Sequence, residues 1–179
     1  EEKDQYRSHV SLESLEAGGS AVYATNGVRL VLTRIRLNKT SGSIPDADRR
    51  ETGKNSVVLA DGGSKVTMEF CEVNSHAQSA DGVTASGEGT KVTLQEGMVS
   101  TSRNGSAALN ATNNSKIIVQ KTIVNTYSNQ SPAFYTCKDG TIEVTEAKGE
   151  NAGQAAPSFY VSGGTIKAEK CELSSAKWT

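Results

Sequence analysis

A pattern of apolar residues repeats along the chain at an interval near 25 residues, and this repeat limits the folds open to the sequence. Each repeat contains a stretch in which alternate residues are apolar, as in a half-buried β-strand. The residues that open these stretches are Val28, Val66, Val92, Ile117, Ile142 and Ile166. Their spacings are 38, 26, 25, 25 and 24 residues, and the first becomes about 25 if residues 40–52 form an insertion. A constant period of this length is typical of proteins whose repeat units stack on one another.

Two more apolar columns share the period and predict two further strands in each repeat. One lies upstream of the opening residue, at Val22, Val58, Val83, Ala108, Phe134 and Phe159. The other lies seven residues downstream of it, at Ile35, Val73, Val99, Val124, Gly149 and Leu173. Gly, Asn, Asp and Ser separate the stretches, as expected for turns. We therefore predict an all-β fold, a right-handed single-stranded parallel β-helix of about six coils of about 25 residues, with three short strands per coil.

Other repeat folds fit the sequence less well. A leucine-rich repeat needs a Leu-x-x-Leu-x-Leu frame, which is absent, and no segment has a 3.6-residue periodicity long enough for a helical repeat. We expect residues 1–179 to form one β-helix domain, with residues 1–19 as a partial coil or N-terminal cap and residues 40–52 as a loop insertion. Because the chain stops in mid-coil without a polar cap, we expect it to come from a longer solenoid.

Charge and hydropathy argue against several classes of partner. The chain has 19 basic and 20 acidic side chains and a net charge of −1, so we expect neither nucleic-acid binding nor attraction to an anionic membrane. No apolar run approaches the roughly 20 residues that a membrane-spanning helix needs, so we expect no membrane insertion by this segment. The two histidines, His9 and His76, have no neighbours at ligand spacing, and we expect no metal or other cofactor.

A first candidate contact surface is a column of lysines at the start of one predicted strand. Lys65, Lys91 and Lys116 each precede the opening residue of a repeat. Equivalent residues of successive coils lie about 4.8 Å apart, so these side chains would form a basic ladder able to meet an anionic glycan. A solvated strand edge without a partner is the alternative.

A second candidate surface is aromatic. Tyr23, Tyr135 and Tyr160 fall in one column, and the last two lie on adjacent coils beside Phe134 and Phe159. If the phenylalanines face inward, the tyrosines face outward and offer an amphipathic contact. An aromatic stack that only stabilises the fold remains open.

The third candidate is the insertion itself, since long loops on a rigid scaffold commonly carry function. It contains an apolar residue near its centre and charges of both signs. The residues we expect to contact a partner are Ile44, Asp46, Asp48, Arg49 and Arg50.

Many right-handed β-helices act on polysaccharides, so an enzymatic role is one alternative for this chain. Such sites need carboxylates on adjacent coils, as an acid and base pair or as a calcium cluster. No two acidic residues fall in the same column of neighbouring coils. The stretch Asn125-Thr126-Tyr127 also lacks the aspartate of the Asn-Thr-Asp motif found in pectinase-type enzymes. We therefore expect a chain without catalytic residues.

Several stretches resemble the coils of bacterial autotransporter (type V secretion) passenger domains in the style of their repeat. They are Gly89-Thr90-Lys91-Val92-Thr93-Leu94, Asn114-Ser115-Lys116-Ile117-Ile118-Val119 and Gly163-Gly164-Thr165-Ile166-Lys167-Ala168. The resemblance implies a virulence-associated protein that is secreted or exposed on the outer membrane, with a C-terminal translocator domain in the full-length protein. It implies an adhesin or a ligand of a host receptor, growth-factor-like in some members, and it assigns no site residue.

The expected function is therefore non-catalytic binding to a host-cell surface protein or glycosaminoglycan. Two alternatives stay open. The chain could be part of a polysaccharide-active β-helix enzyme or phage tailspike whose catalytic coils lie elsewhere, or it could be a structural stalk that projects another domain.

Overall fold

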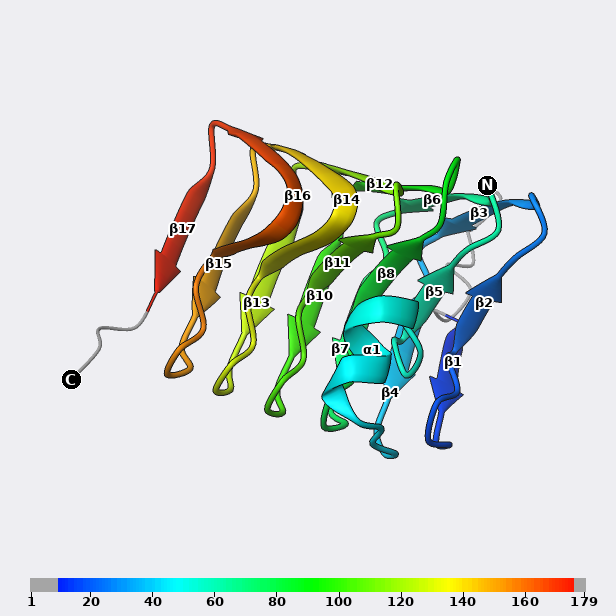
Figure 1. The fold of residues 1–179 in the computed structure, drawn as a ribbon, viewed down its shortest axis with the longest axis horizontal. Coiled ribbons are helices and arrows are strands. Elements are labelled where there is room, and N and C mark those ends of the chain that lie inside the picture. The colour runs from blue at the N-terminus through cyan, green and yellow to red at the C-terminus, as the bar shows by residue number, and fades with distance from the viewer. Residues whose placement is uncertain (1–9, 176–179) are drawn as a thin grey trace, which may run out of the picture.

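The predicted β-helix is confirmed. The computed structural model describes residues 10–175, apart from the side chains of residues 46–48, and its strands pair in parallel with the equivalent strands of the next coil. They form a solenoid of about six turns, which Figure 1 shows side by side along the long axis. Among the described residues, no helix is long and apolar enough to cross a membrane.

Three strand columns make up three faces of the solenoid. The first face contains β2 (Val22–Ala24), β5 (Val58–Ala60), β8 (Val83–Ser86), β11 (Leu109–Thr112), and the beginnings of β14 (Phe134–Thr145) and β16 (Phe159–Glu169). The second contains β3 (Arg29–Thr33), β6 (Lys65–Glu69), β9 (Lys91–Gln95), β12 (Lys116–Gln120) and the ends of β14 and β16. The third contains β1 (Ser11–Ser14), β4 (Arg36–Lys39), β7 (Glu72–Ser75), β10 (Met98–Thr101), β13 (Ile123–Thr126), β15 (Lys148–Asn151) and β17 (Glu172–Ser175).

The last two coils depart from the expected three short strands. In each, the strands of the first and second faces are continuous, giving β14 with 12 residues and β16 with 11. The two strands pair with each other, with a register shift between Cys137 and Gly140, where the chain bends from one face to the next.

Two of the predicted columns need correction in their register. Leu30, not Val28, pairs with Val66, and Leu37, not Ile35, pairs with Val73. A shift by two residues keeps each side chain on the same side of a strand, so both alignments satisfy the alternating pattern.

The predicted column on the first face also needs correction in its register, because Leu109, not Ala108, pairs with Val83 and Phe134. Both Ala108 and Leu109 are fully buried, so burial of an apolar residue did not distinguish the two alignments.

The core lies inside the coils and consists of the inward column of each face. Val66, Val92, Ile117 and Ile142 are at most 1% exposed. In the last coil, Ile166 is only partly buried, because no coil of the described chain stacks on its outer side.

The corner between the second and third faces is built by one left-handed residue per coil. These residues have φ between 48° and 57° and are Arg34, Phe70, Glu96, Lys121, Glu146 and Lys170. A single residue in this conformation reverses the pleat and turns the chain sharply. Along the last four members the charge alternates, and at the start of the column the Arg34 guanidinium lies 4.9 Å from the centroid of the Phe70 ring.

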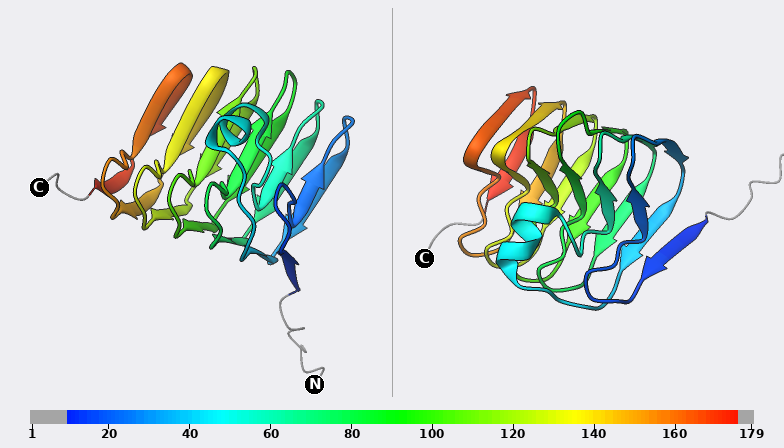
Figure 2. Two further views of the ribbon diagram at one scale, coloured as in Figure 1. Left: turned by 60° about the horizontal axis from the view of Figure 1, so that its bottom comes forward. Right: turned by 45° about the vertical axis from the view of Figure 1, so that its right-hand side comes forward.

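The insertion contains a helix as well as a loop, whereas we expected a loop alone. Helix α1 spans Asp46–Thr52, follows Pro45 and ends at Gly53, whose φ of 72° closes it with a bond from the Gly53 N–H to the Arg49 carbonyl (2.8 Å). Figures 1 and 2 show α1 lying on the outside of the coils that follow it in the sequence.

Candidate binding groove

The side chains that face outward on the first face form one column, which α1 covers in its middle. From the first coil to the last, the column reads Tyr23, Leu59, Thr84, Asn110, Tyr135 and Tyr160. Tyr23 and Tyr160, at the two ends, are 59% and 44% exposed, whereas Asn110 and Tyr135 are 0% and 5% exposed. The helix therefore converts the middle of an outer solenoid face into a buried layer.

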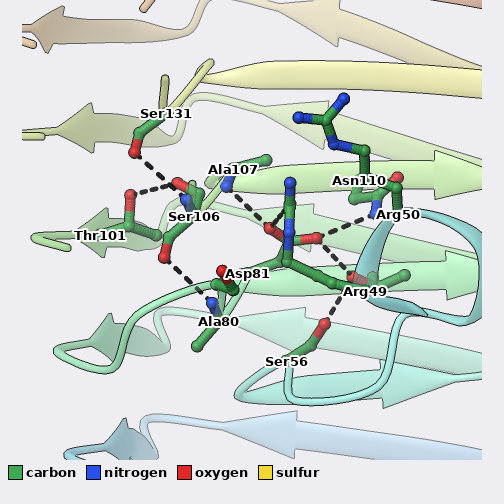
Figure 3. Close-up of polar contacts among 12 residues, drawn as sticks. Arg49, Arg50, Ser56, Ala80, Asp81, Thr101, Ser106, Ala107, Asn110 and Ser131 are labelled. Carbon is green, nitrogen blue, oxygen red and sulfur yellow. Dashed lines mark hydrogen bonds and ion pairs between the residues drawn. The ribbon is translucent and has the colours of Figure 1, made fainter. Parts of the chain in front are cut away.

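A buried ion pair fixes α1 to this face. The guanidinium of Arg49 donates from Nη1 to Oδ1 of Asp81, and both side chains are almost fully buried, at 2% and 0% exposure. Figure 3 shows Arg49 reaching from the helix to Asp81 on the coil beneath it. Losing either partner of such a pair leaves the other charge buried, so the two residues hold the helix in one place.

Other donors complete the environment of the Asp81 carboxylate. The Ala107 N–H donates to Oδ1 (2.7 Å), and Asn110 Nδ2 donates to Oδ2 (2.9 Å). Burial raises the pKa of Asp81 above its ordinary value, while the positive charge of Arg49 and the bonds from Asn110 and Ala107 act in the opposite direction. Contacts among Arg49, Asp81, Ala107 and Asn110 therefore join α1 both to the turn before β8 and to β11.

Three further contacts hold the C-terminal half of α1 against later coils. Asn113 Nδ2 donates to the Glu51 carbonyl (2.8 Å), and Lys138 Nζ lies 3.0 Å from the Glu51 carboxylate. Beneath the helix, the Cys137 thiol lies 3.5 Å from the Arg50 carbonyl. The insertion leaves the solenoid between β4 and β5, yet α1 touches residues three coils further on.

Between α1 and the last two coils lies a groove of about 270 Å³. The helix contributes Arg49 and Arg50 to it. The coils contribute Gln130, Pro132, Tyr135, Ala155, Pro157 and Tyr160. The rings of Tyr135 and Tyr160 are stacked, with their centroids 5.3 Å apart and their planes inclined by 28°.

The hydroxyl of Tyr135 is strongly affected by this setting. Burial is the largest of the causes that raise the pKa of Tyr135 to about 12, and the neighbouring Cys137 thiol contributes in the same direction. The positive charge of Arg50, which lines the same groove, opposes the shift. Tyr135 is therefore a neutral hydrogen-bonding group at physiological pH.

The structure brings together candidates that the sequence left on separate surfaces. Arg50 from the insertion, together with Tyr135 and Tyr160 from the aromatic column, lines one groove. Arg49 also borders the groove, but its guanidinium is buried against Asp81. Ile44 is half-buried and does not line the groove, and the side chains of Asp46 and Asp48 lie outside the described part of the structure.

The predicted lysine column forms on a different face. Lys65, Lys91 and Lys116 pair in register on the second face, and Arg29 extends the column by one coil. Arg29, Lys65 and Lys91 border an open depression of about 290 Å³. Lys116 Nζ is 2.7 Å from the carboxylate of Glu143, and this contact is the first cause that lowers the pKa of Glu143.

Four residues of this region were not predicted from the sequence: Asp81, Gln130, Pro132 and Pro157. Asp81 aligns in register with Ser56 and Ala107 just before the strands of the first face, so it is a lone carboxylate in a column of neutral residues. Burying an unpaired carboxylate is energetically costly, so a single Asp in a column of neutral residues predicts a buried partner for it. Pro132 and Pro157 occupy the same column and could have marked the groove as its apolar rim.

No protein-family model, curated protein or solved structure matches the chain. Among the side chains that the structure describes, no three of His, Cys, Asp or Glu converge as metal ligands. The three cysteines are free thiols, Cys71 and Cys137 buried and Cys171 partly exposed. The class of protein that the fold defines is a parallel β-solenoid, here with an inserted helix docked on one outer face.

Proposed function

We propose that this chain is a non-catalytic binding segment of an exported bacterial protein of the autotransporter passenger type, secreted or exposed on the outer membrane. Its partner is a molecule of the host-cell surface, a protein or a glycosaminoglycan. The observation that carries the proposal is the groove between α1 and the stacked Tyr135 and Tyr160.

A rigid solenoid with an added element is a common way to build a recognition surface. The coils fix the tyrosines by backbone pairing, and the insertion supplies a cation beside them. Clefts that combine aromatic side chains with a few convergent polar groups are the usual form of a ligand site. A chain that served only as a stalk would need neither the docked helix nor the exposed aromatic ring of Tyr160.

The basic column of Arg29, Lys65, Lys91 and Lys116 supports a second mode of contact with the same class of partner. Arg29, Lys65 and Lys91 lie in register, about 4.8 Å apart, and attract an extended polyanion such as a glycosaminoglycan, whereas Lys116 at the end of the column is paired with Glu143. Such attraction is screened by salt and competed by heparin, so it can be separated from contact through the groove.

Binding of the purified chain to cultured mammalian cells tests the proposal. We expect saturable binding that Tyr160→Ala reduces, whereas Tyr127→Ala does not, because Tyr127 is equally exposed but lies outside the groove. A paired Lys65→Gln and Lys91→Gln variant, with and without heparin, measures the part played by the basic column.

The outcomes distinguish the alternatives. Loss of binding only in the paired lysine variant moves the contact to the second face and contradicts the groove as the site. Absence of any saturable binding contradicts the proposed function and favours a structural stalk. Release of shortened glycans from the cells would instead favour a polysaccharide-active protein.

A further inference from the structure

The second face carries an open depression whose charged lining residues are all cations. Its volume is about 290 Å³, and it lies across β3, β6 and β9. The residues that line it are Arg29, Lys65, Val66, Thr67, Lys91 and Thr93. No acidic side chain is among the described residues that border it, so the depression favours a ligand with negative charge.

Most of the hydrogen-bonding capacity of these cations is unused within the chain. The side chains of Arg29 and Lys91 form no hydrogen bond or ion pair with any residue that the structure describes. Lys65 Nζ donates to the Gly89 carbonyl on the next coil, and because an ammonium has three N–H donors, two remain for a ligand. Lys116, which is paired with an acidic side chain, does not border the depression. The part of the basic column that is open to an anion is therefore its first three coils.

Two threonine hydroxyls lie beside the lysines. Thr67 and Thr93 are two residues further along β6 and β9, so they lie on the same outward side of the face as Lys65 and Lys91. Both threonines are half-buried, and neither hydroxyl has a hydrogen-bond partner among the residues that the structure describes. Each of the two coils therefore presents one ammonium and one hydroxyl donor to the same depression.

The kinds of donor in the depression favour an oxyanion with three free oxygens over a carboxylate. A carboxylate has two oxygens in one plane and is matched best by the planar fork of a guanidinium. Two of the three cations here are lysines, whose ammonium groups act as point charges and impose no plane. The tetrahedral head of a sulfate ester accepts from an ammonium, from the hydroxyl beside it and from the cation of the next coil, about 4.8 Å away.

We propose that Arg29, Lys65 and Lys91, together with Thr67 and Thr93, bind the sulfate groups of a sulfated glycan. The glycan runs along the solenoid axis, across β3, β6 and β9, because the three cations are in register over about 10 Å in that direction. This inference rests on the proposed function, and it names the chemical group that the basic column recognises in a glycosaminoglycan partner.

Three polysaccharides separate the sulfate from the carboxylate. Chondroitin carries carboxylates alone, chondroitin sulfate carries both groups on the same backbone, and dextran sulfate carries sulfate alone. Each is titrated into the purified chain and followed by calorimetry. We expect chondroitin sulfate and dextran sulfate to bind at least about tenfold more tightly than chondroitin, because only they carry the tetrahedral group. Equal binding of chondroitin and chondroitin sulfate, or no binding of dextran sulfate, would overturn the inference.

The salt dependence counts the cations that take part. For dextran sulfate, the logarithm of the binding constant should fall with the logarithm of the salt concentration with a slope of about −2, as expected when three cations displace counterions from a flexible polyanion. Lys65→Gln and Lys91→Gln should each weaken binding about threefold and reduce this slope by about 0.7. Lys54→Gln removes the same charge from an exposed lysine outside the depression and should change neither. Two lysine variants that behave like Lys54→Gln would contradict the site.

The hydroxyls are tested with a variant of the same shape and charge. Thr67→Val combined with Thr93→Val removes two donors and keeps β-branched side chains in the strands, so we expect about threefold weaker binding of dextran sulfate with the salt slope unchanged. Thr141→Val, on the same face but outside the depression, is the control. Binding unchanged by the double variant would contradict the role of the hydroxyls, and circular dichroism checks that each variant retains the fold.

Failure of this inference is distinguishable from failure of the proposed function. If dextran sulfate neither binds the chain nor competes with cells, the sulfate assignment is wrong. Saturable cell binding that Tyr160→Ala reduces would then still support the groove as the contact with a host partner. Competition of cell binding by dextran sulfate but not by chondroitin, lost in the paired Lys65→Gln and Lys91→Gln variant, would support both proposals.

Discussion

Arg49 and Asp81 are the two side chains on which the position of α1 depends most. They lie 32 residues apart in the sequence, and both side chains are almost fully buried. Burying a charge is tolerated when it is paired and hydrogen-bonded, and Asp81 receives bonds from Arg49, Ala107 and Asn110. A contact of this kind specifies where the helix docks more than it adds net stability.

A double-mutant cycle tests the buried pair. Arg49→Met leaves the Asp81 carboxylate without its cation, so we expect the free energy of unfolding to fall by about 3–5 kcal/mol, or by less if α1 lifts and lets water reach the carboxylate. Adding Asp81→Asn removes the buried charge and should restore most of the loss. Urea unfolding measures both, with Arg103→Met as the control, and losses that simply add would contradict the coupling.

Ionisation of the Tyr135 hydroxyl gives a pH-dependent measure of burial beside α1. The pKa of Tyr135 is about 12, above the ordinary value of 10.0, because the side chain is buried. The contribution of the neutral Tyr135 side chain to the free energy of unfolding is therefore complete below pH 10 and is lost as the pH rises through 12. Absorbance at 295 nm, as the difference between the wild type and Tyr135→Phe, should show a midpoint near pH 12. A midpoint near pH 10 in the folded protein would contradict the burial.

At the scale of elements, the strands could be predicted and the helix could not. Alternating apolar residues with a period near 25 indicate the strands, because every coil must present an inward face to the same core. The register of the first coil was wrong by two residues, since Val28 and Leu30 satisfy the same alternation. The seven residues of α1 are too few for a helical period, and its only local signals are Pro45 before it and Gly53 after it.

The position of the groove could not be predicted for a different reason. Arg50, Tyr135 and Tyr160 were each identified as candidates from the sequence, but their meeting depends on where α1 docks. That position is set by Arg49 and Asp81, which no local pattern links. The lysine column could be predicted to lie on one face, because the positions of its residues depend only on the repeat.

Two glycines with the same backbone conformation test the docking of α1. Gly53 and Gly27 both have φ of 72°, so an alanine introduces similar backbone strain of about 1 kcal/mol at either. A Cβ at Gly53 would also overlap the side chains of Thr84 and Leu59, whereas at Gly27 it would meet nothing within 4 Å. We expect Gly53→Ala to lower the melting temperature more than Gly27→Ala. Equal shifts would show that the close approach seen at Gly53 is absent in solution.

At the scale of the whole molecule, the solenoid is a stack in which each coil contacts only its neighbours. Stability in such a stack is a sum of nearest-neighbour terms, and a coil with a neighbour on each side is held more firmly than one at an end. The inward side chains reflect this difference. Val92 and Ile117 are fully buried, while Ile166 and Leu173 in the last coil are only partly so.

Amide hydrogen exchange should follow this gradient. We expect the slowest exchange in β8 to β13, where coils lie on both sides. Among the described strands, we expect the fastest exchange in those of the two end coils, β1 to β3 and β16 to β17, which pair on one side only. Mass spectrometry of peptic fragments measures the rates. Equal protection of the central and final coils would contradict the nearest-neighbour description.

The central claim is that α1 stays docked across later coils and so completes the groove, and the three thiols report on it directly. Cys71 lies inside the solenoid, Cys137 lies beneath α1, and Cys171 is partly exposed. Iodoacetamide labelling, followed by mass spectrometry, should modify Cys171 first and spare Cys137 in the wild type. In Arg49→Met it should modify Cys137 while Cys71 remains protected. Labelling of Cys137 in the native wild type as fast as Cys171 would contradict the docked helix.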